Sequence, residues 1–111
     1  VALVTGRVLE AEGRREEAVA AYERAISLNP ANPRARMLLV GAASRVNRLD
    51  LAEQQLQQLI TMGYQPSRSH FALGQIAQSR GQIDVAERHY REALRLEPGL
   101  AMAADALRRL R

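Results

Sequence analysis

The amino-acid sequence predicts an all-α protein made of antiparallel helical hairpins, and three observations lead to this prediction. First, a turn followed by a helix start recurs three times along the 111 residues. Second, aromatic side chains are scarce, with three Tyr and one Phe, so the core must consist of Ala, Leu, Ile and Val. Ala and Leu are the best apolar helix formers. Third, no segment shows the alternating pattern of a strand.

The repeat is clearest at its turn, where Gly13, Asn47 and Gly81 follow one another at intervals of 34 residues. Gly and Asn best tolerate the left-handed conformation that ends a helix. Asp50 and Asp84 lie in the first turn of the helix that follows, where negative charge suits the helix dipole. Three further columns keep the same period: Ala18, Ala52 and Ala86; Tyr22, Leu56 and Tyr90; Ala25, Leu59 and Ala93.

Apolar residues at helical spacing continue from each of these helix starts and give each second helix one apolar face. Prolines fall where one hairpin ends and the next begins, at Pro30, Pro33, Pro66 and Pro98. We therefore expect helices at about 2–12, 15–28, 34–46, 49–62, 68–80, 83–96 and 99–110. Helices this short are marginal alone in water, so stacking of each hairpin on its neighbour must supply their stability.

This pattern resembles the tetratricopeptide repeat. The first repeat carries Gly6, Gly13, Ala18, Tyr22, Ala25 and Pro30, and the third carries Leu73, Gly74, Gly81, Ala86, Tyr90, Ala93 and Pro98. The middle repeat departs from the pattern at Val40, Leu59 and Pro66. The first helices depart too, with Ala2 and His70 where the family often has Trp, and Leu9 and Ala77 where it often has Tyr.

The resemblance implies a right-handed α-solenoid forming a single domain over residues 1–111. Its repeats would span about 1–32, 33–66 and 67–98, and a capping helix would follow at 99–111. A capping helix is expected physically because the last hairpin would otherwise leave an apolar face in water. The chain begins with Val1, and we expect it to be a piece of a longer protein.

The resemblance also implies a protein-interaction module that holds a partner peptide or helix in a groove lined by the first helix of each hairpin. The predicted groove residues are Arg7, Arg34, Met37, Leu38, Arg45, Arg68, Phe71 and Gln75. The same face continues through Gln78, Met102, Asp105 and Arg109. Arginine is well shaped for two-point recognition of a carboxylate, so the partner segment is expected to mix acidic and apolar residues. The alternative is that the apolar members only pack between hairpins and the arginines are solvated.

Members of the family that bind chaperones hold a C-terminal carboxylate with basic and Asn side chains. The matching positions of this sequence are Leu3, Arg7, Leu38, Arg68 and Ala72. Only Arg68 keeps the charge at its expected place, and the Asn residues are absent. The sequence therefore argues against a chaperone clamp.

Two alternative functions remain open. The stretch Met62–Pro66 resembles the junction of pentatricopeptide repeats, which bind RNA one base per repeat. However, the net charge of +4 comes from arginines interleaved with Glu, a pattern typical of an ion-paired helix surface rather than a nucleic-acid stripe. The third possibility is a structural spacer or self-association unit in a larger enzyme or assembly factor.

Catalytic and metal-binding motifs are not found in the sequence. There is no cysteine, Gly-rich phosphate loop or nucleophile elbow, so we expect neither an enzyme nor a cofactor. Of the two histidines, His70 is expected to pack at the hairpin interface and His89 to point outward. No apolar run approaches the ~20 residues that span a bilayer. A soluble chain, cytoplasmic or periplasmic, with a protein or peptide partner is expected.

Overall fold

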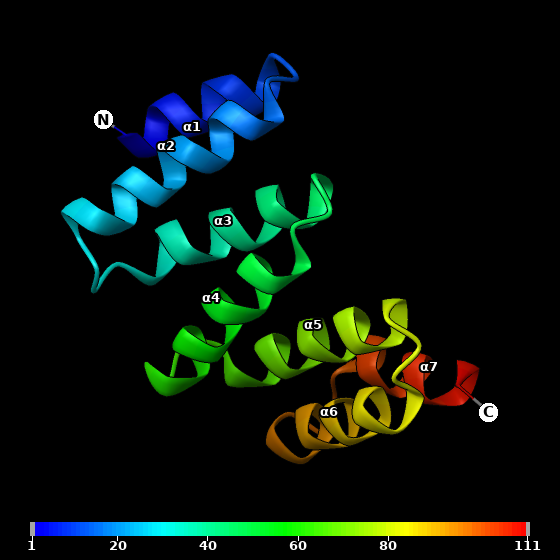
Figure 1. Ribbon diagram of the computed structural model, residues 1–111. Helices are drawn as coiled ribbons and strands as arrows, with labels where there is room; N and C mark the ends of the chain where they lie inside the picture. The colour runs from blue at the N-terminus through cyan, green and yellow to red at the C-terminus, as the bar shows by residue number, and fades with distance from the viewer. Residues whose placement is uncertain (1, 111) are drawn as a thin grey trace. The chain divides into compact units, whose positions relative to one another are not determined.

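The computed structural model of the chain describes residues 2–110. Within them the chain forms helices and no strand, which confirms the all-α prediction (Figure 1). The helices of this part of the chain are α1 (Ala2–Ala11), α2 (Arg15–Leu28), α3 (Pro33–Arg45), α4 (Leu49–Thr61), α5 (Pro66–Ser79), α6 (Ile83–Leu96) and α7 (Ala101–Arg109). Helix α1 packs on α2, α2 on α3, α5 on α6, and α6 on α7.

The turns between paired helices have the conformation that the repeat predicts. Gly13 and Gly81 have φ values of 78° and 75°, and Asn47, which stands in the same column, has a φ of 61°. A left-handed residue at this place closes the end of one helix and reverses the chain into the next. The left-handed backbone conformation therefore explains why Gly or Asn recurs at this position of the repeat.

Two helix starts differ from the sequence prediction by two residues each. Helix α5 begins at Pro66, because Gln65 takes a left-handed conformation and the proline occupies the first helical position, where its missing N–H costs nothing. Helix α7 begins only at Ala101, because Leu100 is extended and precedes the first turn.

The chain divides into two compact units, Val1–Gln55 and Leu56–Arg111. In the first unit, the fully buried side chains of Ala18, Val19 and Tyr22 pack with Leu39 and Ala42. They join α2 to α3. The alanines expected to allow close helix contact are buried in both units, since Ala18 and Ala86 have no exposed surface.

Among the described residues of the second unit, two clusters of buried side chains adjoin each other, and Phe71 packs against both of them. One cluster comprises Ala77, Ala86 and Tyr90, and the other comprises Ala93, Leu100 and Ala103. The half-buried Leu107 of α7 packs against the first cluster. Helix α7 therefore covers the last hairpin, as a capping helix would.

In each unit a tyrosine ring packs closely against a helical glycine. A Cβ atom on Gly6 would lie 2.4 Å from Cε1 of Tyr22, and one on Gly74 would lie 2.5 Å from Cε1 of Tyr90. Distances this short leave no room for any side chain, so glycine is required for the first helix to approach the ring.

Ser69 is a buried polar residue that the structure leaves unsatisfied. Its side chain is 1% exposed, and its hydroxyl has no hydrogen-bond partner within residues 2–110. Ala35 and Ala103 stand in the same repeat column and are fully buried. A buried hydroxyl without a partner costs free energy, so Ser69→Ala is expected to raise the free energy of unfolding by about 1 kcal/mol.

Urea unfolding of the intact chain measures this change. The matched control is Ser79→Ala at the exposed end of α5, which should change stability by less than about 0.5 kcal/mol. A loss of stability in Ser69→Ala would show that the hydroxyl has a partner after all.

Candidate functional site

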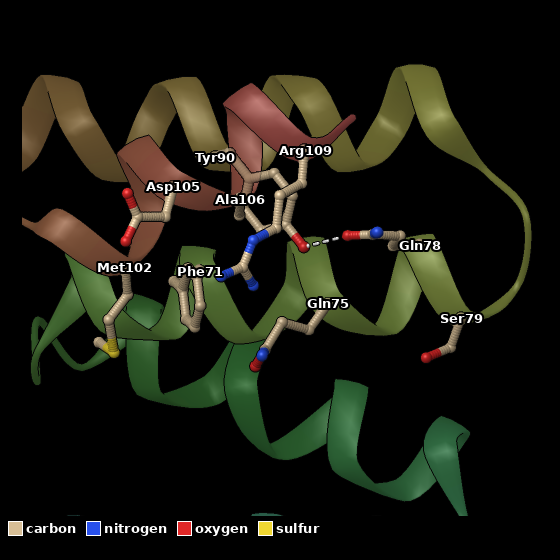
Figure 2. A pocket seen from close by; sticks show the side chains of 9 residues that line it. All are labelled: Phe71, Gln75, Gln78, Ser79, Tyr90, Met102, Asp105, Ala106 and Arg109. Carbon is tan, nitrogen blue, oxygen red and sulfur yellow. Dashed lines mark hydrogen bonds between the residues drawn. The ribbon is translucent and has the colours of Figure 1, made fainter. Parts of the chain in front are cut away.

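A cleft of about 670 Å³ is lined by residues of α5, α6 and α7 within the second unit (Figure 2). Its lining comprises Phe71, Gln75, Gln78, Ser79, Tyr90, Met102, Asp105, Ala106 and Arg109. Apolar, cationic and carboxamide groups therefore share one open surface.

The aromatic part of this cleft is held in place by packing. The rings of Phe71 and Tyr90 lie 5.6 Å apart between centroids, tilted by 40°. The Tyr90 hydroxyl donates a hydrogen bond of 2.7 Å to Oε1 of Gln78 (Figure 2). Burial raises the pKa of the Tyr90 hydroxyl, so it stays a donor at neutral pH. Because Oε1 of Gln78 accepts this bond, the carboxamide is oriented and its NH2 group remains to donate.

The charged residues of the cleft differ in their pairing. Asp105 accepts a hydrogen bond from Arg108 on the surface of α7. Arg109 makes no ion pair or hydrogen bond with any residue of the described 2–110 segment. Figure 2 shows the Arg109 side chain extending into the cleft toward Phe71. The cleft thus presents, beside an aromatic ring, a guanidinium that has no partner among residues 2–110.

The first unit has a smaller cavity of about 340 Å³, lined by Glu10, Ala11, Arg15 and Arg45. Glu10 occupies the repeat column of Gln78, and the Tyr22 hydroxyl donates to its Oε1 at 2.5 Å. Burial raises the pKa of Tyr22, and this bond to Glu10 raises it further. Arg45 donates to the other oxygen of Glu10, so this predicted groove cation already has a carboxylate partner inside the chain.

The remaining predicted groove residues are found at several places. Phe71 and Gln75 lie together in the α5–α7 cleft with Met102, Asp105 and Arg109. Leu38 is half-buried and packs against the core of the first unit, and Met37 is also half-buried. The other predicted groove arginines, Arg7 on α1, Arg34 on α3 and Arg68 on α5, are exposed and do not line this cleft.

Sequence reasoning assigned Tyr90 only to the core and did not foresee its polar contact with the cleft. A signal was present, because a buried tyrosine hydroxyl usually finds a hydrogen-bond partner. In the structure this partner is Gln78 on the facing helix α5.

The two histidines meet across α5 and α6. Their Nδ1 atoms are 3.1 Å apart, and the ring centroids are 5.4 Å apart. His70 therefore packs at the hairpin interface as predicted. The prediction that His89 points outward is wrong, because its ring faces His70.

Several surface charges of the described residues form local pairs. Arg14 bonds to Glu17, Arg91 to Glu87, and Arg95 to Glu92, all within one helical turn. This agrees with the interpretation of an ion-paired helix surface. Within residues 2–110, no three His, Cys, Asp or Glu side chains gather as metal ligands would. None of the helices in this range has the length and apolar character needed to span a membrane.

Comparison with known proteins identifies matching sequence families and folds. Two family models described as "Tetratricopeptide repeat" match residues 9–76 and 67–100. A TPR repeat-containing thioredoxin, TTL4 of Arabidopsis thaliana, is 32% identical over 84 residues. This match covers 76% of the chain but only 12% of that relative.

Solved structures show the same fold. The TPR domain of Arabidopsis OM64 superposes with a TM-score of 0.85 at 25% identity, over 99% of this chain and 91% of that one. The first TPR of Spaghetti (RPAP3), bound to the HSP90 peptide SRMEEVD, gives 0.84 at 21% identity, over 99% and 87%. The second TPR domain of human RPAP3, in complex with the HSP70 peptide SGPTIEEVD, gives 0.81 at 24% identity, over 96% and 88%.

Proposed function

We propose, because the chain belongs to the tetratricopeptide repeat family, that it is a protein-interaction module whose α5–α7 cleft holds a segment of the partner. The observation that carries this proposal is the meeting of Phe71, Met102 and Arg109 in one open cleft. Arg109 has no partner among the described residues, and Met102 is 44% exposed.

Each kind of side chain in the cleft suits a different part of a peptide. The guanidinium of Arg109 can hold a carboxylate through two parallel hydrogen bonds. Phe71 and Met102 offer an aromatic and a thioether surface to an apolar side chain. Gln75 and the oriented Gln78 carry both donors and acceptors, as the main chain of an extended segment requires. The proposed partner segment therefore mixes acidic and apolar residues.

The solved structures of the same fold support this type of segment. Two of them hold peptides, SRMEEVD and SGPTIEEVD, that combine glutamates with Met, Val or Ile. We do not assign those chaperones to this chain, since only Arg68 keeps the charge that such a clamp requires. The exposed Arg7 and Arg34 of the first unit stay candidates for further contacts.

The test uses a short fluorescein-labelled peptide of alternating Glu and Leu with a C-terminal amide. Binding is measured by fluorescence anisotropy. We expect Arg109→Glu to weaken binding at least about tenfold, because it removes an attraction and adds a repulsion. The melting temperature should barely change, since reversing an unpaired exposed charge alters stability by less than about 0.5 kcal/mol.

The matched control is Arg24→Glu, which reverses an exposed charge on α2. A second control peptide, with Gln in place of Glu, should bind more weakly than the first. The proposed site is rejected if Arg24→Glu lowers affinity and Arg109→Glu does not. Failure of the acidic peptide to bind at all would reject an acidic-apolar partner.

A further inference from the structure

The position that Gln78 occupies in the repeat is occupied in the first unit by Glu10. These two residues stand two periods apart, and so do Tyr90 and Tyr22. In each unit the tyrosine hydroxyl donates a hydrogen bond to Oε1 of this residue, at 2.5 Å for Glu10 and 2.7 Å for Gln78. Both tyrosine side chains are buried, so each hydroxyl needs a partner here. Glutamate meets this need as well as glutamine does, so the tyrosine does not explain the carboxamide of the second unit.

The two residues differ in the other terminal atom of the side chain. Oε2 of Glu10 is an acceptor, and Arg45, on the next first helix α3, donates to it. The first unit therefore fills this position with its own arginine. Nε2 of Gln78 is a donor, and it makes no hydrogen bond with any residue of the described 2–110 segment. The second unit thus keeps the tyrosine bond but has an open donor in place of a filled acceptor.

The first-helix position that follows α5 in the repeat belongs to α7, and this helix also brings an arginine. Arg109 lines the cleft together with Gln78, and no carboxylate within residues 2–110 pairs with it. Asp105 lines the cleft too, but its carboxylate accepts a hydrogen bond from Arg108. One cleft therefore presents an open guanidinium and an open amide donor. A carboxylate from outside the chain is the group that both can receive.

We propose that Gln78 makes the α5–α7 cleft selective for an acidic side chain of the partner, by donating its NH2 group to the carboxylate that Arg109 neutralises. The selectivity for a partner segment rests on the proposed function, whereas the reception of a carboxylate at Gln78 does not. The bond from Tyr90 occupies Oε1 (Figure 2), so the NH2 group is what Gln78 offers to the cleft.

The first experiment compares Gln78→Glu with the wild-type chain at pH 7.5, using the Glu-Leu peptide amide described above and its Gln-Leu counterpart. The fold should be kept, because the new carboxylate can accept the Tyr90 hydrogen bond as Glu10 accepts that of Tyr22. We expect the affinity for the Glu-Leu peptide to fall at least about tenfold, because a donor becomes an anion. The affinity for the Gln-Leu peptide should change less than about twofold, because its carboxamides can donate to the new carboxylate.

The matched control is Gln58→Glu, which makes the same change at an exposed position of α4 that does not line the cleft. It should leave both affinities unchanged. The proposal is overturned if Gln78→Glu leaves the affinity for the Glu-Leu peptide intact or weakens both peptides equally. An equal loss in Gln58→Glu would also overturn it, because net charge alone would then explain the effect.

A second measurement needs neither a variant nor the peptide. The side-chain NH2 signals of the isotope-labelled wild-type chain are assigned by NMR through the bonds of each glutamine and titrated with N-acetylglutamate α-amide. The signals of Gln78 should move downfield as a hydrogen bond to the carboxylate forms, and those of Gln58 should stay in place. N-acetylglutamine amide should move neither. Signals of Gln78 that do not respond to the carboxylate would overturn the proposal, even if Gln78→Glu failed to fold.

The two measurements together separate this proposal from the proposed function. If the Glu-Leu peptide does not bind the wild type while the carboxylate probe moves the Gln78 signals, the proposed function fails and the reception of a carboxylate at Gln78 stands. If the peptide binds the wild type and Gln78→Glu with the same affinity, the cleft still holds a partner segment, but Gln78 does not select its acidic side chain.

Discussion

Gly74→Ala is expected to lower the free energy of unfolding by about 3 kcal/mol, the upper part of the range for overpacked cores. The new Cβ would lie 2.5 Å from Cε1 and 2.7 Å from Cδ1 of Tyr90. This ring cannot move aside easily, because it is 1% exposed, packs against Phe71 and is tied to Gln78 by its hydroxyl. The chain must instead separate α5 from α6. Chemical denaturation of the intact chain measures the loss.

Two further variants identify the cause of this loss. Gly41→Ala also adds a methyl group inside a helix, but the nearest atom to its Cβ would be Nη1 of Arg45 at 3.6 Å. Since this is an ordinary contact, the higher helix propensity of Ala should give a gain of about 0.5–1 kcal/mol. Combining Gly74→Ala with Tyr90→Leu should recover at least about 0.5 kcal/mol relative to the sum of the single changes. Equal losses at Gly74 and Gly41 would show that ring contact is not responsible.

The fold was largely predictable because its signals are local. The left-handed Gly13 and Gly81 and the apolar spacing after them set α2 and α6, whose bounds, Arg15–Leu28 and Ile83–Leu96, match the expected ranges. The starts of α5 and α7 were less predictable, because they depend on backbone conformations at Gln65 and Leu100 that no periodic column specifies.

The candidate site was predictable only in part, because its chemistry depends on contacts between distant residues. Phe71 and Gln75, which the sequence places on the inner face of the first helices, both line the cleft, and their role in binding stays a prediction. That Arg45 would be engaged by Glu10, 35 residues earlier, depends on side-chain conformations that periodicity does not determine. The position of His89 could have been predicted, because its column partner is Gln55, a residue of the hairpin interface.

Ala18→Leu is expected to destabilise the chain by about 1–3 kcal/mol, whereas Ala20→Leu should have little effect. Both residues lie on α2, two positions apart, so helix propensity and the substitution are the same for each. Ala18 has no exposed surface and packs in the core of the first unit with Val19, Tyr22 and Leu39, while Ala20 is exposed. A leucine at position 18 has to push α2 away from its neighbours.

Thermal and urea unfolding of the two variants give the comparison directly. A loss of 1 kcal/mol corresponds to a fall of about 4–8 °C in the melting temperature of a small domain, so the two outcomes are easily separated. If both leucines cost the same, the face of α2 that packs into the core would be misassigned. Ala86 provides an independent check in the second unit, because it occupies the same repeat column and is also fully buried. Ala86→Leu should therefore reproduce the effect of Ala18→Leu, as the repeat requires if small residues at this column set the spacing between helices.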